Sequence, residues 1–165
     1  MNKFLLMVCL FIICCGGEPE RGELLAAPED ISIREQRIVL STTLTRIKGS
    51  DQPVFGACMV NAKDSTPLPT SMTLEAVWLV HEKEIWRPHF TEKYTQIESR
   101  RISIFKVFAD GPKWEPLQYV DVVVRIGHNG HFQLLRASNQ IIGVVTKVPG
   151  PLIESDSGSE EERSP

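Results

Sequence analysis

Apolar and polar residues alternate along two stretches of the chain. From Met72 to Val80 an apolar side chain stands at every second position, and Val120 to Ile126 repeats the pattern. Alternation with a period of two residues predicts a strand with one buried face. Trp78 is the large aromatic residue on the first of these faces, so we expect it to point into the core.

Further strands are predicted on both sides of these two. Ile31 to Ile47 and Val54 to Asn61 are rich in apolar and β-branched residues, and Arg101 to Ala109 carries apolar residues on both faces before Asp110-Gly111-Pro112 ends it. A last strand is expected from Ile141 to Val148, after a break at Ser138-Asn139-Gln140. Asp64 to Thr70, with its two prolines, predicts a loop, and Glu82 to Arg100 fits a short helix or an edge strand.

The clearest local signal is a hairpin. Asn129-Gly130 separates the alternating run 120–126 from a second apolar run, 132–137. Asn-Gly between two such runs favours a two-residue type I′ turn, which needs a positive φ at both positions. Val122, Val124, Phe132 and Leu134 are expected on the buried side. Leu135 and Ala137 are apolar too, so the alternative is a second strand that is covered on both faces.

Six or seven strands separated by turns predict an all-β fold, a single β-sandwich of the immunoglobulin-like or transthyretin-like type. An immunoglobulin domain with its inter-sheet disulfide needs two cysteines in its body, and here Cys58 stands alone outside the leader. Fold class by itself does not indicate function.

The N-terminus has the features of an export signal. Lys3 precedes a run of 12 residues, Phe4 to Cys15, without a charged side chain. A membrane-spanning helix needs roughly 20 apolar residues, so the run favours a signal peptide over a span. Residues 1–14 are therefore predicted to be removed.

The end of this leader, Ile12-Ile13-Cys14-Cys15-Gly16-Gly17, resembles the lipobox of bacterial lipoproteins. In that family an apolar residue stands three positions before the modified cysteine and a small residue directly before it. Ile12 and Cys14 fill these places if Cys15 is modified; Cys14 departs from the usual Ala, Gly or Ser. The resemblance implies lipidation at Cys15 and a membrane anchor. The alternatives are lipidation at Cys14, plain cleavage, and a leader that is not processed.

Charge divides the mature chain into a mildly basic domain, 31–148, and two acidic flanks. Residues 15–30 are predicted to be a lipidated cysteine and a tether, and residues 149–165 a disordered acidic tail. The domain shows no stripe of clustered Lys and Arg, so its charge does not predict a nucleic-acid partner.

His128 and His131 flank the predicted turn, where they would face each other and could share a zinc or copper ion. A stable site needs three or four ligands, and the sequence places no others nearby. Two solvated turn histidines are therefore the favoured interpretation, and no cofactor is predicted.

For the other potentially reactive residues, too, we favour a structural interpretation over a catalytic one. His81 and His89 are general acid–base candidates, but the first lies in a charged turn, His81 to Glu84. Cys58 lies in an apolar run and is expected to be a buried small side chain. Trp86, Trp114 and Tyr119 are expected at strand ends, either as lids or as a contact patch for a protein or glycan. No catalytic motif is present, so an enzyme is not predicted.

The leading hypothesis is a lipid-anchored, non-catalytic binding or structural module of the bacterial cell envelope, at the outer membrane or cell surface. One alternative is an envelope metal-binding protein or enzyme that uses His128 and His131. Another is a eukaryotic secreted protein with a phosphorylated tail, because Ser155, Ser157 and Ser159 lie among acidic residues.

Overall fold

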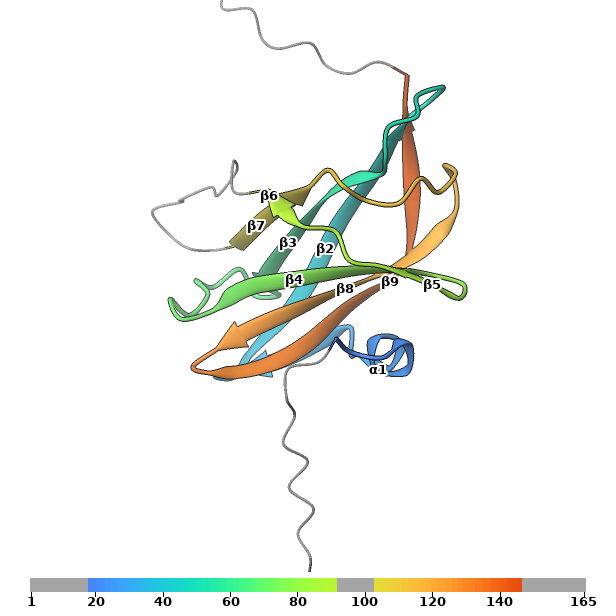
Figure 1. Cartoon of the computed structure of the whole chain (residues 1–165). Helices are drawn as coiled ribbons and strands as arrows, with labels where there is room; N and C mark the ends of the chain where they lie inside the picture. Colours follow the sequence, from blue (N-terminus) through green and yellow to red (C-terminus); the bar gives the residue numbers. More distant parts are fainter. Residues whose placement is uncertain (1–17, 92–102, 147–165) are drawn as a thin grey trace, which may run out of the picture.

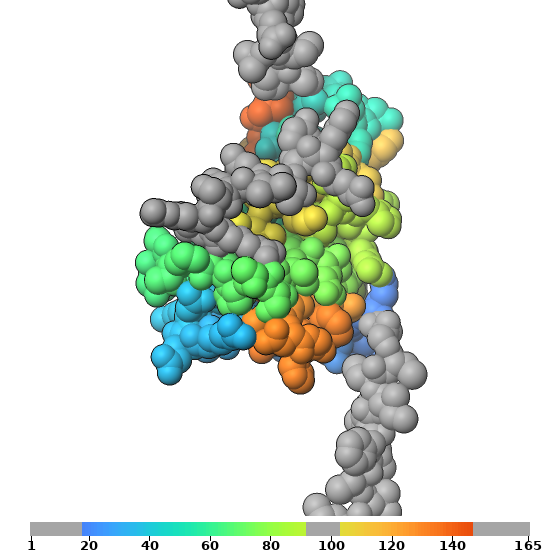
Figure 2. Space-filling model, turned by 90° about the vertical axis from the view of Figure 1, so that its left-hand side faces the viewer, coloured from blue at the N-terminus to red at the C-terminus, as the bar shows by residue number. Residues whose placement is uncertain are grey.

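The computed structural model describes residues 18–91 and 103–146, which are coloured by sequence in Figure 1 and Figure 2. This part of the chain is almost entirely β. One short helix, α1 (Arg21–Ala26), precedes the strands. The strands are β1 (Asp30–Ile33), β2 (Gln36–Ile47), β3 (Phe55–Ala62), β4 (Thr73–His81), β5 (Glu84–Trp86), β6 (Phe90–Thr91), β7 (Ser103–Phe108), β8 (Tyr119–His128) and β9 (His131–Val145). The all-β prediction is confirmed, and the choice between sandwich types stays a prediction.

The strands form a single curled sheet in the order β5-β4-β8-β9-β2-β3-β7-β6, with β1 paired to β2. The long strand β9 joins the two halves of this sheet. It pairs antiparallel with β8 as far as Ile141, and then runs parallel to β2 from Ile142 to Val145. The curl brings the two halves together around one core (Figure 1). Both halves of the sheet contribute side chains to that core, including Ile38, Leu44, Val60, Leu79, Phe108, Val124, Leu135 and Ile142.

The expected break between two C-terminal strands is wrong, because β9 is continuous. Instead, the pairing of β8 and β9 slips by one residue between Val120 and Val122. Asn139 has a φ of 52°, and its amide donates to the Asp121 carboxylate at 2.9 Å. The Ser-Asn-Gln segment therefore marks a bulge that bends β9 from one half of the sheet to the other.

The Asn129-Gly130 hairpin is confirmed. Both turn residues have positive φ, 49° and 78°, and His128 pairs directly with His131. Val122 and Val124 are buried as expected, but the expected face of β9 is wrong. Phe132 is 61% exposed, whereas Leu135 is fully buried. The reason is the register, which places Val124 opposite Leu135 and so puts these two side chains on one face.

Trp78 is buried, but on the outer face of the sheet rather than in the main core. A register shift between Leu74 and Ala76 inserts one extra residue into β4. Beyond this bulge the faces exchange, so Val77 and Leu79 enter the core while Ala76, Trp78 and Val80 face outward. Apolar residues stand at every second position from Met72 to Val80 without interruption, but the residues that enter the core change from even to odd positions at the bulge.

Residues 21–27 do not form the expected tether. α1 lies on the outer face of β4, β8 and β9, where Leu24 is fully buried in a cluster with Ala76, Trp78, Val80 and Val123. Burial of a leucine side chain stabilises this docking by about 1.5–3 kcal/mol. None of the helices in residues 18–91 and 103–146 is long and apolar enough to cross a membrane. The leader, Cys15, and the acidic tail from residue 149 lie outside the described residues.

Candidate functional site

A groove of about 790 Å³ with a mainly apolar lining opens on the described surface. It lies on the outer face of β2, β3 and β7, the half of the sheet remote from α1 in Figure 1. The lining residues are Thr43, Thr45, Ile47, Gln52, Pro53, Phe55, Gly56, Ala57, Thr91, Val107, Phe108 and Ala109, and none of them carries a charge. The groove therefore suits an apolar partner.

Strand alternation positions these side chains. In β2, Leu44 points into the core, so Thr43 and Thr45 on either side of it point outward. The pairing aligns Thr43 with Ala57 and Ala57 with Val107, which makes one row across three strands. The side chain of Ala57, at the middle of this row, is small, and this makes the groove deeper between its neighbours.

Gly56 makes room beneath the groove. A Cβ at this position would lie 2.7 Å from the Phe108 ring and 2.7 Å from the carbonyl oxygen of Thr43. The absent side chain thus allows Phe108 to pack directly under β3. The groove could not be predicted from the sequence because its residues are spread over positions 43–109, and only the pairing of the strands brings them together.

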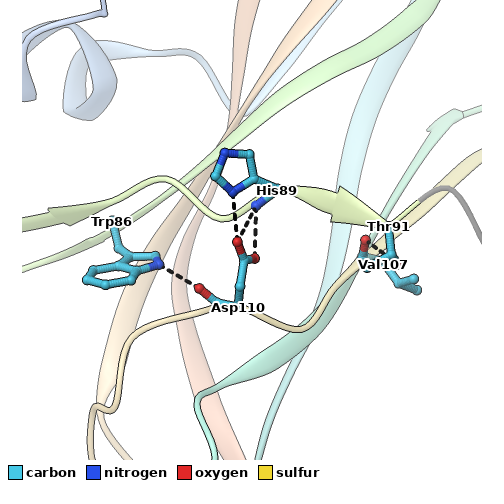
Figure 3. Close-up of polar contacts among 5 residues, drawn as sticks. All are labelled: Trp86, His89, Thr91, Val107 and Asp110. Atoms are coloured by element: carbon cyan, nitrogen blue, oxygen red, sulfur yellow. Dashed lines mark hydrogen bonds and ion pairs between the residues drawn. The ribbon is translucent and has the colours of Figure 1, made fainter.

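One wall of the groove is fixed by polar contacts around Asp110 (Figure 3). The Asp110 carboxylate accepts from the His89 amide at 2.9 and 3.1 Å and lies 2.8 Å from His89 Nδ1. The Asp110 carbonyl oxygen accepts from Trp86 Nε1 at 2.8 Å, and Thr91 Oγ1 donates to the Val107 carbonyl oxygen at 3.2 Å. These bonds hold the segment 86–91 against β7.

His89 was an acid–base candidate, and its structural role is different. Its ring is 86% exposed, and its recorded partner is Asp110, with no hydroxyl or thiol nucleophile among its described contacts. The geometry fits a positioning role in which His89 and Asp110 clamp β6 next to the groove.

His128 and His131 face each other as predicted. His128 Nδ1 lies 2.9 Å from Ser71 Oγ, and its Nε2 lies 3.1 Å from Asn129 Nδ2. No cluster of three or more His, Cys, Asp or Glu residues that could hold a metal ion occurs in residues 18–91 and 103–146. Within this part of the chain the pair has no third ligand.

His81 packs against Trp114, with 5.2 Å between ring centroids, and its Nδ1 lies 3.0 Å from the Tyr119 carbonyl oxygen. Trp114 Nε1 donates to Glu84 at 2.5 Å. The structure places the three aromatic residues on three different segments. Trp114 is half-buried against the core, Trp86 lies on the edge strand β5, and Tyr119 is exposed opposite Ile141.

Cys58 lies in the core, as the sequence predicts, and is fully buried. Burial raises the pKa of its thiol to about 12. A thiol needs an electropositive, accessible setting to act as a nucleophile, and the core supplies neither.

Comparison with known proteins gives no relative: no protein-family model, no curated protein and no solved structure matches this chain.

Proposed function

We propose that this protein is a lipid-anchored binding module of the bacterial cell envelope, and that it binds an extended segment of a partner protein in the apolar groove. The leader and the lipobox-like residues before Cys15 support the anchor. The observation that carries the binding role is the groove itself, an uncharged hollow of about 790 Å³ on the outer face of a sheet.

The choice of a protein partner follows from the shape and the edge of the site. The groove is neither an enclosed cavity nor a flat surface. Small-molecule sites bury most of their ligand, so this partly open shape favours a larger partner over an isolated acyl chain. Phe55 and Met59 are 36% and 39% exposed on this face. Phenylalanine and methionine are enriched at protein interfaces.

The edge of β7 next to the groove is where we expect such a segment to find backbone hydrogen-bonding groups. β6 pairs with β7 at Val107 and Phe108, and within the described residues no strand pairs with the same edge from Ser103 to Lys106. An extended peptide can add to a free edge by main-chain hydrogen bonds while alternate side chains enter a neighbouring pocket. On this proposal the partner segment contacts both the edge and the groove.

Photo-crosslinking tests this proposal in the cells that produce the protein. Benzoylphenylalanine replaces Phe55 at the groove or, as the matched control, Phe132, an exposed phenylalanine on the distant hairpin. We expect one defined protein adduct at position 55, none at position 132, and loss of the adduct when Ala57→Asp is added. Adducts to lipid at position 55, equal adducts at both positions, or no adduct would contradict the proposed partner.

A further inference from the structure

The N-terminal strap, residues 18–29, is attached to the domain along its whole length. Its apolar contact is Leu24, which is buried against the outer face of the sheet beside Trp78. Arg21 Nε donates to the Glu82 carbonyl oxygen at 2.7 Å at one end of α1. At the other end, the Arg136 guanidinium donates to the Leu25 carbonyl oxygen.

Two acidic side chains at the ends of the strap contact basic and polar partners on the domain. Arg87 donates to Glu18 at 2.5 Å, and Ser138 donates to Glu29. The guanidinium carbon of Arg87 also lies 5.7 Å from the centroid of the Trp78 ring. Glu18 and Glu29, two of the acidic residues before residue 31, thus contribute to the attachment of the strap.

This attachment shortens the connection to the proposed anchor. A tether from Cys15 to Ile31 could extend about 55 Å, since an extended chain spans about 3.3–3.6 Å per residue. The first described strap residue that contacts the domain is Glu18. From Cys15 to Glu18 the chain can extend only about 10 Å.

We infer that the docked strap holds the α1 face of the domain against the lipid headgroups and turns the groove away from the bilayer. This inference rests on the proposed lipid anchor at Cys15. In Figure 1, α1 lies at the lower end of the domain, and the connection between β2 and β3 lies at the upper end. Ile47, Gln52 and Pro53 of the groove belong to that upper region.

Fluorescence energy transfer to an acceptor lipid tests the orientation. The full-length lipidated protein is placed in phosphatidylcholine–phosphatidylglycerol vesicles with a donor at Lys83→Cys, next to the strap, or at Lys48→Cys, at the far end. Cys58 is fully buried, which keeps the label on the introduced cysteine. We expect stronger transfer at position 83 than at position 48.

Two changes to the strap test its role. Leu24→Asp should abolish the difference between the two positions, whereas Ala26→Asp, which adds the same charge on the exposed side of α1, should preserve it. A ten-residue Gly-Ser insertion between Gly17 and Glu18 leaves the docked strap intact and should also abolish the difference, even if Leu24→Asp does not fold.

Equal transfer at the two positions in the unaltered protein, or a difference that survives the insertion, would overturn the inference. An intact mass without a lipid adduct would overturn the anchor, and the inference with it. An adduct accompanied by equal transfer would overturn the orientation alone, so the two failures are distinguishable.

Discussion

His128 of β8 lies directly opposite His131 of β9, across a turn in which Asn129 and Gly130 have φ values of 49° and 78°. This pairing sets the register of the whole hairpin, because each further pair along the two strands follows from it as far as Val122 and Ala137. The turn therefore determines which residues of β9 reach the core.

Gly130→Val should destabilise the protein by about 1–3 kcal/mol, the cost of holding a β-branched residue at positive φ. A Cβ at this position meets no atom within 4 Å, so the loss would be backbone strain and not a clash. Gly130→Asn is the matched control, since asparagine tolerates this conformation. Urea denaturation measures both, and equal stability of the two variants would show that the turn type is misassigned.

The two turn histidines should differ in their effect on stability. His131 is exposed, so His131→Ala should change the free energy of unfolding by less than about 0.5 kcal/mol. His128→Ala removes the contact with Ser71 and should cost about 0.5–1.5 kcal/mol. A stable zinc site needs three or four ligands, and no cluster of that size occurs in the described residues. Added zinc should therefore leave the melting temperature unchanged. A zinc-dependent rise that His131→Ala abolishes would favour the metal-site alternative.

Leu24→Ala should lower the free energy of unfolding by about 2–5 kcal/mol, because it empties a fully buried leucine site beside Trp78. Ala26→Ser on the exposed side of α1 should cost less than about 0.5 kcal/mol. Urea denaturation followed by tryptophan fluorescence reports both the stability and the surroundings of Trp78. If the two variants were equally stable, the strap would not be docked in solution.

Alkaline pH should weaken the fold through Cys58. Burial raises the pKa of its thiol from 9.0 to about 12, so above pH 9 the unfolded chain loses this proton while the folded chain keeps it. Stability is then fully present below pH 9 and is lost as the pH rises toward 12, at up to about 1.4 kcal/mol per pH unit. Cys58→Ala should flatten this dependence, measured by urea denaturation between pH 8 and 10. Parallel pH curves for the two proteins would exclude a buried thiol.

Local turn chemistry made much of the fold predictable. Asn129-Gly130 was recognisable because few residue pairs adopt two positive φ angles, and its register alone would have placed Leu135 opposite Val124. The turn at Arg34-Glu35, which divides the expected strand 31–47 into β1 and β2, also has two positive φ angles, 49° and 69°. Neither residue type favours that conformation, so the turn could not be predicted from these residues.

Long-range arrangements were not predictable. The bulge after Leu74 exchanges the faces of β4 without interrupting the apolar alternation, so Trp78 was placed in the wrong layer. α1 spans six residues, too few for a periodic pattern, and its one deeply buried side chain becomes visible only against the sheet. The groove depends on β2 and β7 both pairing with β3, which no local pattern encodes.

Mass spectrometry of the intact protein extracted from the membrane is the most direct test of the lipid anchor on which the proposed function depends. We predict a chain that begins at Cys15 and carries a diacyl or triacyl adduct, since stable retention needs more than one acyl chain. A soluble product that begins at Gly16 or later, or a chain that retains the leader without lipid, would contradict it.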